Sequence, residues 1–269
     1  MIFLKNVLIT GVASGIGYAL AKKYSENKFL VYGIDIVRTK PNIDNLNYYS
    51  CDITSETDLL NILNEFKNKD VVFDLIINVA GIHKMASLVE TDYKKIKSVI
   101  DVNLLGTMLV NKTFHPLLNK KGRIVIITSE VASFDPLPFN SLYSISKIAL
   151  DAYAQGLRQE LNLLNQKVIT IRPGAVETPL SNGSSIDTKN LADDTVLYKN
   201  EAKHFLSLVE KFTGKKISPS ILAKKIYKIT LKKRPKYIYK IHQNLGLFLL
   251  SILPKRLQCF IVKLLLNRK

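Results

Sequence analysis

Short apolar runs rich in Val and Ile alternate with longer segments of helical periodicity along most of this chain. Such runs are typical of strands in a parallel sheet, which are buried on both faces because helices cover both sides. The pattern therefore predicts an α/β fold, a doubly wound parallel sheet of the Rossmann-like kind with right-handed crossovers. We expect strands at residues 6–10, 29–34, 47–51, 73–78, 123–128, 168–171 and 237–240, and helices at 15–27, 56–68, 92–103, 104–119 and 141–165.

Length and composition limit the number of domains. A chain of 269 residues, 47% of them hydrophobic, suits one large α/β core rather than two. We expect a single catalytic domain at residues 1–240, in which the polar segment 174–214 forms a substrate lid, and a C-terminal helical extension at 241–269. Cys51 and Cys259 lack the spacing of a metal site or disulfide framework, and the N-terminus has no export signal, so we expect a cytoplasmic protein without a metal.

The positive charge is concentrated near the end of the chain. Residues 203–269 contain seventeen Lys or Arg and one acidic residue, Glu210, and so carry +16 of the formal net charge of +17. The preceding residues are almost neutral as a group. The basic region therefore needs an explanation separate from that of the catalytic domain.

The last residues combine these cations with apolar side chains. The apolar run at 245–253 is too short to cross a bilayer, which takes about twenty residues. Two interpretations of residues 244–269 stay open: a basic amphipathic segment at the inner face of a membrane, or a segment that packs on the catalytic domain or a second subunit. Nucleic acid is disfavoured as a partner because apolar residues are interleaved at helical spacing, namely Leu257, Phe260, Ile261, Leu264 and Leu265.

A glycine-rich turn follows the first predicted strand and opens the first predicted helix. Residues 10–17 read T-G-V-A-S-G-I-G. Glycines let a backbone turn sharply beside a pyrophosphate, and the N-terminus of a helix offers unpaired N–H groups and positive potential. The spacing is G-x-x-x-G-x-G rather than G-x-G-x-x-G, so by itself the turn also fits an ordinary tight connection.

Asp35 ends the second predicted strand, where a dinucleotide-binding fold places an acidic residue. A carboxylate there accepts a hydrogen bond from the adenosine ribose and repels a 2′-phosphate. NAD is therefore favoured over NADP as the cofactor. Arg38 and Lys40 are close enough in sequence to keep NADP open.

Tyr143 and Lys147 are four residues apart in a predicted helix and so share one face. A nearby lysine can lower the pKa of a tyrosine, usually about 10, by about one to three units, which makes the pair a proton exchanger. Such a pair also arises by chance in a chain with twelve Tyr, and it needs support from other residues. Ser129 follows the fifth predicted strand and offers a hydroxyl to a substrate oxygen, and Asn103 ends a predicted helix and offers an amide to a water.

Together these motifs resemble the short-chain dehydrogenase/reductase family. The matching segments occur in the family's order and cover residues 1 to about 180. They are residues 10–17, Asp52, residues 78–81, Asn103, Ser129, Tyr143 with Lys147, residues 173–174 and residues 176–178. Two departures are Val79, where the family has a second Asn in N-N-A-G, and a gap between Ser129 and Tyr143 that is one residue longer than the commonest spacing.

The resemblance implies a role for each matching residue. Asn103, Ser129, Tyr143 and Lys147 form the family's catalytic tetrad, which passes a proton through the lysine and a water to solvent. Asp52 contacts the adenine, and the segment 173–178 contacts the nicotinamide end. The implied cofactor contacts are Gly11, Ser14, Gly15, Ile16, Gly17, Asp35, Asp52, Ile53, Asn78, Ala80, Gly81, Tyr143, Lys147, Pro173, Gly174, Val176 and Thr178.

The implied reaction is hydride transfer between a nicotinamide and a secondary alcohol or its ketone. The basic, apolar tail resembles family members that act on steroids, retinoids or other lipid-like alcohols, and the family implies a dimer or tetramer. A 3-ketoacyl-type reductase of carrier-bound substrates stays open, although Asp35 argues against its usual NADP preference. A non-catalytic dinucleotide-binding regulator is the alternative outside enzymes, and the intact tetrad disfavours it. No lid residue identifies the substrate.

Overall fold

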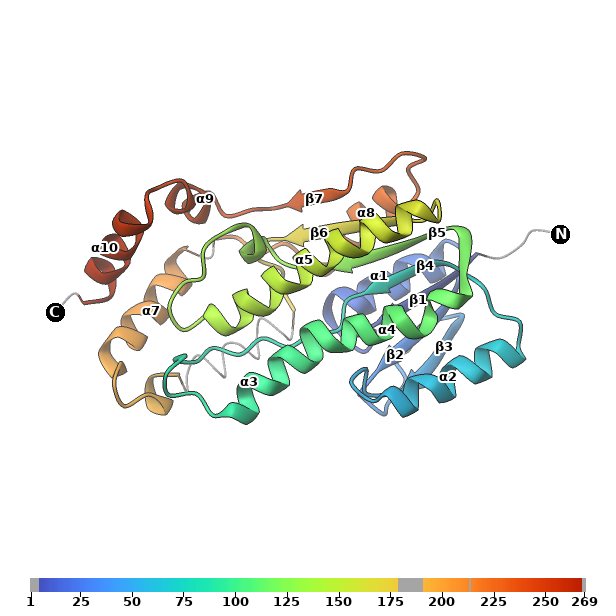
Figure 1. Cartoon of the computed structure of the whole chain (residues 1–269), viewed down its shortest axis with the longest axis horizontal. Helices are drawn as coiled ribbons and strands as arrows, with labels where there is room; N and C mark the ends of the chain where they lie inside the picture. Colours follow the sequence, from blue (N-terminus) through green and yellow to red (C-terminus); the bar gives the residue numbers. More distant parts are fainter. Residues whose placement is uncertain (1–4, 179–190, 213, 268–269) are drawn as a thin grey trace.

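The computed structural model describes residues 5–178, 191–212 and 214–267, and its centre is a seven-stranded parallel sheet (Figure 1). The strand order is β3-β2-β1-β4-β5-β6-β7, so the direction of winding reverses between β1 and β4. Ligands of open α/β folds bind outside the carboxyl ends of the strands at such a reversal. The predicted doubly wound sheet is confirmed, with β1 (Asn6–Thr10), β2 (Leu30–Asp35), β3 (Leu46–Ser50), β4 (Phe73–Asn78), β5 (Leu118–Ile127), β6 (Lys167–Pro173) and β7 (Ile238–Ile241).

Both faces of the sheet are covered by helices, as the continuous apolar runs predict. Along β1, Val7 and Ile9 face one core, whereas Leu8 faces the other, and all three are fully buried. The first core is closed by α1 (Gly15–Glu26) and α8 (Pro219–Thr230). The second is closed by α2 (Glu56–Asn68), α4 (Thr107–Phe114) and α5 (Ser141–Leu163).

The predicted helices 92–103 and 104–119 are in fact one continuous helix. It runs through α3 (Tyr93–Ile100), a π-helical segment η1 (Asp101–Gly106) and α4. Asn103 therefore lies inside a helix and does not end one, which corrects the expectation for this residue. The π-helical segment adds a residue to the turn, and π-bulges of this kind occur often at functional sites.

The predicted C-terminal end of this helix, at residue 119, is also wrong. A 3₁₀ turn, η2 (His115–Leu117), ends it at Pro116, and β5 begins at Leu118 rather than at the expected residue 123. Proline cannot continue a helical hydrogen-bond ladder, which explains the early end. The first residues of β5 include the exposed Lys120 and Lys121, so this part of the strand lacks the apolar pattern of a buried strand.

The C-terminal extension is helical and packs on the rest of the protein. It contains α9 (Leu245–Ser251) and α10 (Lys255–Leu266), and α10 lies beside α7 (Lys199–Phe212) in Figure 1. Leu266 shares an apolar cluster with Phe205 of α7, and the Leu266 carbonyl bonds His204 Nδ1 at 2.8 Å. Part of the predicted lid, residues 179–190 and 213, lies outside the described residues. Within the described ranges, every helix is too short or too polar to span a membrane.

Candidate active site

The glycine turn between β1 and α1 is folded too tightly to admit side chains. Gly11 has φ of +74° and Gly15 has φ of +55°, in the left-handed region that favours glycine. A Cβ on Gly11 would lie 3.0 Å from the backbone of Ala80, and a Cβ on Gly17 would lie 1.9 Å from the Gly11 carbonyl oxygen. The backbone can therefore come close to a ligand at the N-terminus of α1.

Ser14 and Ile16 complete this turn in different ways. Ser14 is the N-cap of α1, yet its side chain makes no capping hydrogen bond, so the first N–H groups of the helix are left for an anion. The Ile16 side chain packs against the core on the α1 side of the sheet. Sequence reasoning missed the role of Thr10, whose Oγ1 accepts from the N–H groups of Val79 at 3.0 Å and Ala80 at 3.1 Å. This hydroxyl ties the glycine turn to the loop after β4.

The two predicted acidic contacts lie on neighbouring strand ends. Asp35 Oδ2 accepts a hydrogen bond of 2.8 Å from Ala13 N–H, which holds the carboxylate against the glycine turn. Asp52 Oδ1 accepts from both the N–H and the hydroxyl of Thr54, so this carboxylate also caps its own turn. Ile53 is buried, and its side chain occupies the space next to Gly106 of the π-helical segment.

Asn78 at the end of β4 and Gly81 in the loop after it have different surroundings. The Asn78 side chain is buried against α4, where its Nδ2 donates to Asn111 Oδ1 at 2.8 Å, so it joins β4 to α4. Gly81 lies next to two residues of the predicted tetrad. A Cβ on Gly81 would lie 3.0 Å from Asn103 Oδ1 and 3.4 Å from Lys147 Nζ, which shows how closely these two side chains approach the loop.

Asn103 is fully buried and its amide is used within the protein. Its Oδ1 accepts from Ile82 N–H at 2.7 Å, and its Nδ2 donates to the Ile82 carbonyl and to Ser146 Oγ, each at 2.9 Å. Ser146 Oγ in turn donates to the backbone carbonyl of Tyr143 at 2.7 Å. The amide thus fixes the loop after Gly81 to the first turn of α5, whereas the sequence pointed to an amide that holds a water.

Ser129, Tyr143 and Lys147 meet at the carboxyl edge of the sheet. The Ser129 hydroxyl lies near the Tyr143 phenol and acts to lower its pKa. Lys147 Nζ lies 5.8 Å from the centroid of the Tyr143 ring and donates to the Ile127 carbonyl at 3.5 Å. The His83 ring packs edge-on against Tyr143 with centroids 4.4 Å apart. The predicted tetrad is therefore brought together by β5, α5 and the π-helical segment.

The electrostatics of the pair differ from the expectation. Burial raises the pKa of Tyr143 to about 12, and the nearby Ser129 hydroxyl offsets only part of that rise. Burial also lowers the pKa of Lys147 to about 8. Burial is the largest cause in both cases, so the pKa of Tyr143 is raised where the sequence predicted a pKa lowered by Lys147. Tyr143 holds its proton, and Lys147 can change protonation state near neutral pH.

The segment after β6 lies along the same edge. Gly174 N–H donates to the Ile241 carbonyl at 2.8 Å, and a Cβ on Gly174 would lie 1.8 Å from the His242 carbonyl oxygen. Pro173 is the last residue of β6, and the buried residues Val176 and Thr178 belong to the beginning of the predicted lid. These four predicted contacts therefore run together past the end of β6.

Glu130 is a site residue that sequence reasoning missed. It follows Ser129 directly, and its carboxylate is buried beside Gly174, where burial raises its pKa. Its negative charge contributes to the raised pKa of Tyr143. The only sequence signal was an acidic residue immediately after an apolar strand.

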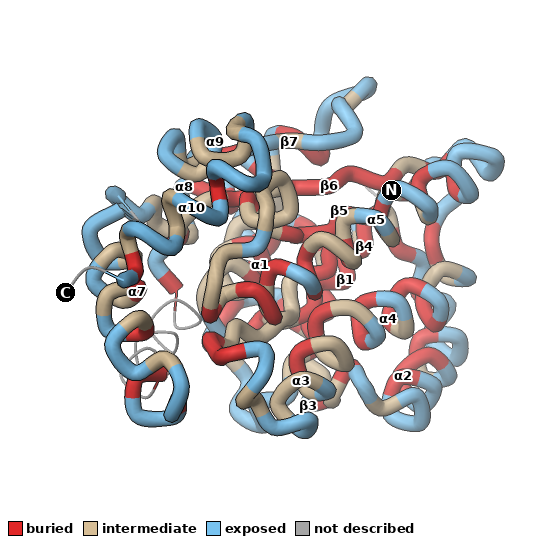
Figure 2. Tube along the Cα trace, turned by 60° about the vertical axis from the view of Figure 1, so that its left-hand side comes forward, coloured by how far each residue is buried: buried red, intermediate tan, exposed pale blue. Residues whose placement is uncertain are grey.

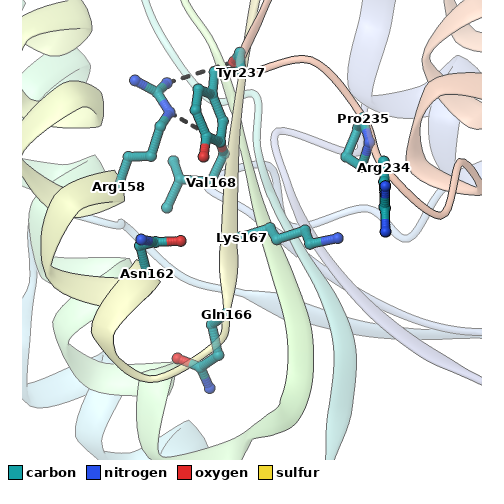
Figure 3. Close-up of a pocket in the computed structure, with 8 residues that line it drawn as sticks. All are labelled: Arg158, Asn162, Gln166, Lys167, Val168, Arg234, Pro235 and Tyr237. Atoms are coloured by element: carbon teal, nitrogen blue, oxygen red, sulfur yellow. Dashed lines mark hydrogen bonds between the residues drawn. The ribbon is translucent and has the colours of Figure 1, made fainter.

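A separate cavity of about 200 Å³ lies at the opposite edge of the sheet (Figure 3). Arg158 of α5 lines this cavity and donates to the carbonyl oxygens of Val168 at 3.1 Å and Tyr237 at 3.5 Å. The guanidinium therefore holds β6 next to the segment that leads into β7. This cavity is at the amino ends of the strands, away from Tyr143, and belongs to the scaffold.

Comparisons with known proteins agree with this geometry. The family model described as "short chain dehydrogenase" matches residues 5–189. An uncharacterized oxidoreductase of Staphylococcus epidermidis is 30% identical over 74% of this chain and 93% of its own length. A 3-ketodihydrosphingosine reductase of Bacteroides thetaiotaomicron is 26% identical over 87% of each chain.

The fold is also similar to that of a solved structure. A short-chain dehydrogenase family protein of Francisella tularensis superposes with a TM-score of 0.72 at 26% identity, over 88% of this chain and 97% of its own. The family model covers most of the present chain, from β1 past the end of β6, and so includes every residue of the tetrad. The chain belongs to the short-chain dehydrogenase family of oxidoreductases.

Proposed function

We propose that this chain interconverts a secondary alcohol and a ketone on an apolar, lipid-like substrate, with NAD preferred over NADP. The observation that carries the proposal is the meeting of three side chains: the Ser129 hydroxyl is near enough to lower the pKa of the Tyr143 phenol, and Lys147 Nζ lies 5.8 Å from the centroid of the Tyr143 ring. A hydroxyl, a phenol and an amine of lowered pKa at one edge of the sheet are the groups that a carbonyl reduction needs around its oxygen.

The glycine turn and its surroundings fit a nicotinamide dinucleotide. A side chain at Gly11 would clash with the backbone of Ala80, so glycine is needed for this turn, and the N-terminus of α1 is free of a side-chain cap. Asp35, held against Ala13 N–H, supports a preference for an adenosine ribose without a 2′-phosphate. When bound, this cofactor accepts or supplies a hydride at the substrate carbon.

The proposed roles of the tetrad follow from its contacts. Ser129 holds the substrate oxygen, and Tyr143, with a pKa raised to about 12, donates the proton that the new hydroxyl needs. Lys147, with a pKa lowered to about 8, replaces that proton. Asn103 acts as a positioning residue because its amide fixes the loop after Gly81 and the first turn of α5.

An apolar substrate is supported by the cluster next to the site. Met85 and Phe139 flank the His83–Asn140 contact beside Tyr143, and they pack with Leu191 and Phe205 of the lid region. The relative from Bacteroides thetaiotaomicron is named for reducing 3-ketodihydrosphingosine, a lipid ketone. Small-molecule substrates and oligomers are usual in the family, and a homodimer or homotetramer in the cytoplasm is part of the proposal.

The carrier-bound alternative receives less support. A basic docking surface for an acidic carrier should surround the entrance to the site. The densest basic run, residues 232–236, instead precedes β7 and so lies at the amino edge of the parallel sheet. A regulator without catalytic activity would have no use for the buried Lys147 amine, since burial of such a group is costly.

A substrate panel tests the proposal. The purified chain would be incubated with ketones from short aliphatic compounds to long-chain keto lipids, with NADH or NADPH, and nicotinamide absorbance would be followed. We expect turnover to rise with the apolar length of the ketone and to be faster with NADH. Cofactor binding without turnover of any ketone or alcohol would favour the regulator, and exclusive turnover of carrier-bound ketoacids would favour the alternative reductase.

A further inference from the structure

The two C-terminal helices carry a row of exposed apolar side chains. Leu245, Phe248 and Leu249 of α9 and its C-cap residue Ile252 are 47% to 69% exposed, and they follow the i, i+3, i+4, i+7 spacing of one helix face. On α10, Leu257, Phe260 and Leu264 are 43% to 61% exposed at i, i+3, i+7. We call these seven side chains the outer face. Figure 2 shows both helices at the surface of the protein, largely in the colours of exposed and half-buried residues.

The opposite side of α10 is fixed to the catalytic domain. Leu266 is buried against α7, and Lys255 forms an ion pair with Asp135 of the loop before α5. Gln258 is buried, and its Nε2 donates to the Leu253 carbonyl at 2.7 Å, which joins α10 to the end of α9. These contacts fix the orientation of α10 on the catalytic domain. The outer face therefore points to solvent in the folded protein.

Only positive charge accompanies the outer face. Arg256 and Lys263 are exposed on α10, seven residues apart and therefore on the same side, next to Phe260. Glu210 is the last acidic residue of the sequence, so no carboxylate side chain belongs to α9 or α10. Apolar side chains edged by Lys and Arg are typical of helices that lie in the interface of an anionic bilayer.

We propose that the outer face of α9 and α10 docks on an anionic phospholipid surface. A second copy of the chain is the main competitor. In a two-fold interface the same patch meets itself, which would bring Arg256 and Lys263 against like charges. A lipid surface accepts both components at once, since phosphate head groups pair with the cations and acyl chains with the Leu and Phe side chains. The proposal does not depend on the reaction proposed above.

Docking would place the entrance of the site near the bilayer. The end of β7 leads directly into α9, and Asn244, the N-cap of α9, donates its N–H to Glu130 beside Ser129. The α10 helix lies on α7, which belongs to the predicted lid. An apolar substrate could then reach the lid without crossing water, although the docking itself is measured independently of turnover.

Vesicle co-sedimentation of the full-length protein tests this inference. Vesicles would contain phosphatidylcholine alone or with phosphatidylglycerol. The variant Arg256→Gln/Lys263→Gln, called the outer-face variant, removes the two cations beside the outer face. The matched control, Lys120→Gln/Lys121→Gln, removes the same charge from exposed lysines at the start of β5, at the opposite end of the sheet. Circular dichroism and NAD binding would verify folding of each variant.

We expect the wild-type chain to bind the anionic vesicles at least tenfold more tightly than the neutral ones. The outer-face variant should bind about 30-fold more weakly, since each cation near an anionic surface contributes about a fivefold change, and the control should stay within about threefold of wild type. Phe248→Asp/Phe260→Asp should abolish binding.

Two results would overturn the inference. One is a wild-type chain that stays in the supernatant with anionic vesicles at low salt, where electrostatic binding is strongest. The other is a Phe248→Asp/Phe260→Asp variant that dissociates to a smaller oligomer in light scattering, without any lipid binding by wild type. That result would assign the outer face to a second copy of the chain.

Discussion

The buried carboxylate of Glu130 accepts a hydrogen bond of 2.6 Å from the backbone N–H of Asn244, 114 residues further along the chain. This contact connects the residue after Ser129 to the N-cap of α9. It therefore joins the end of β5 near Tyr143 to the helices of the outer face.

Replacement of Glu130 by Ala should destabilise the protein, because the N–H of Asn244 would lose its buried acceptor. We expect the free energy of unfolding to fall by about 1–3 kcal/mol. Glu130→Gln is the matched control, since its amide oxygen can still accept that hydrogen bond. Denaturant unfolding of the three proteins at pH 7 measures the difference, and equal losses in both variants would contradict the assigned role of the acceptor.

The same residue should give a pH signature. Burial raises the folded-state pKa of Glu130, so the folded chain retains this proton in a range where the unfolded chain has lost it. Stability contributed by Glu130 is therefore present at pH below its ordinary pKa and is lost as the pH rises through the raised value. The stability of wild type relative to Glu130→Gln should fall with increasing pH, and a difference that is constant or rises with pH would contradict this.

Lys147→Met should stabilise the fold at neutral pH while it removes turnover. Burial lowers the pKa of Lys147 from 10.5 to about 8, so a charged Lys147 destabilises the folded state increasingly as the pH falls from 10.5 towards 8. We expect a gain of about 1–3 kcal/mol at pH 7, which vanishes above the usual pKa of lysine. Unfolding curves at pH 7 and pH 10.5 test this, and a variant less stable than wild type at pH 7 would refute the cost assigned to the buried amine.

Asp35 should determine the choice of cofactor. Asp35→Ser removes the carboxylate to which we attribute the proposed NAD preference, so we expect the KM for NAD to rise about tenfold or more and the use of NADP to improve. Asp35→Asn keeps an oxygen that can accept from Ala13 N–H and removes only the charge, which separates repulsion of the 2′-phosphate from support of the turn. Unchanged KM values for both cofactors in both variants would rule out this role.

Substitutions at two glycines, one in the glycine turn and one in α5, test the role of the turn. Gly11→Ala places a Cβ at 3.0 Å from Ala80 at a φ of +74°, so it should cost stability and weaken NAD binding about tenfold or more. Gly156 lies within α5, and a Cβ there meets nothing within 4 Å. Gly156→Ala should therefore stabilise the chain by about 0.5–1 kcal/mol with unchanged NAD binding. Thermal unfolding and NAD titration measure both changes, and similar effects of the two substitutions would be inconsistent with this account.

The sheet and the glycine turn could be predicted because they depend on local patterns. Apolar runs of five or six residues indicate strands such as β1 and β4. The glycine spacing indicates the turn between β1 and α1. Asn103 could not be placed from sequence, since the π-helical segment around it leaves the helical periodicity almost unbroken. Its partner Ser146 belongs to another helix.

Long-range contacts and burial set the remaining features. Nothing in the sequence pairs Glu130 with Asn244, because hydrogen bonds between distant backbone and side-chain groups leave no pattern. The pKa of Tyr143 was predicted in the wrong direction for the same reason. A spacing of four residues reveals the neighbouring charge of Lys147, whereas the desolvation that dominates depends on packing by residues from other elements, such as His83.

The central claim is that Tyr143 supplies the proton in a carbonyl reduction. The most direct measurement is steady-state turnover of the best ketone by wild type and Tyr143→Phe, together with the Kd of NADH for each. The phenylalanine keeps the ring beside His83 and removes only the hydroxyl near Ser129. We predict a loss in kcat of at least about a hundredfold with the Kd of NADH unchanged. Undiminished kcat in Tyr143→Phe would contradict the account.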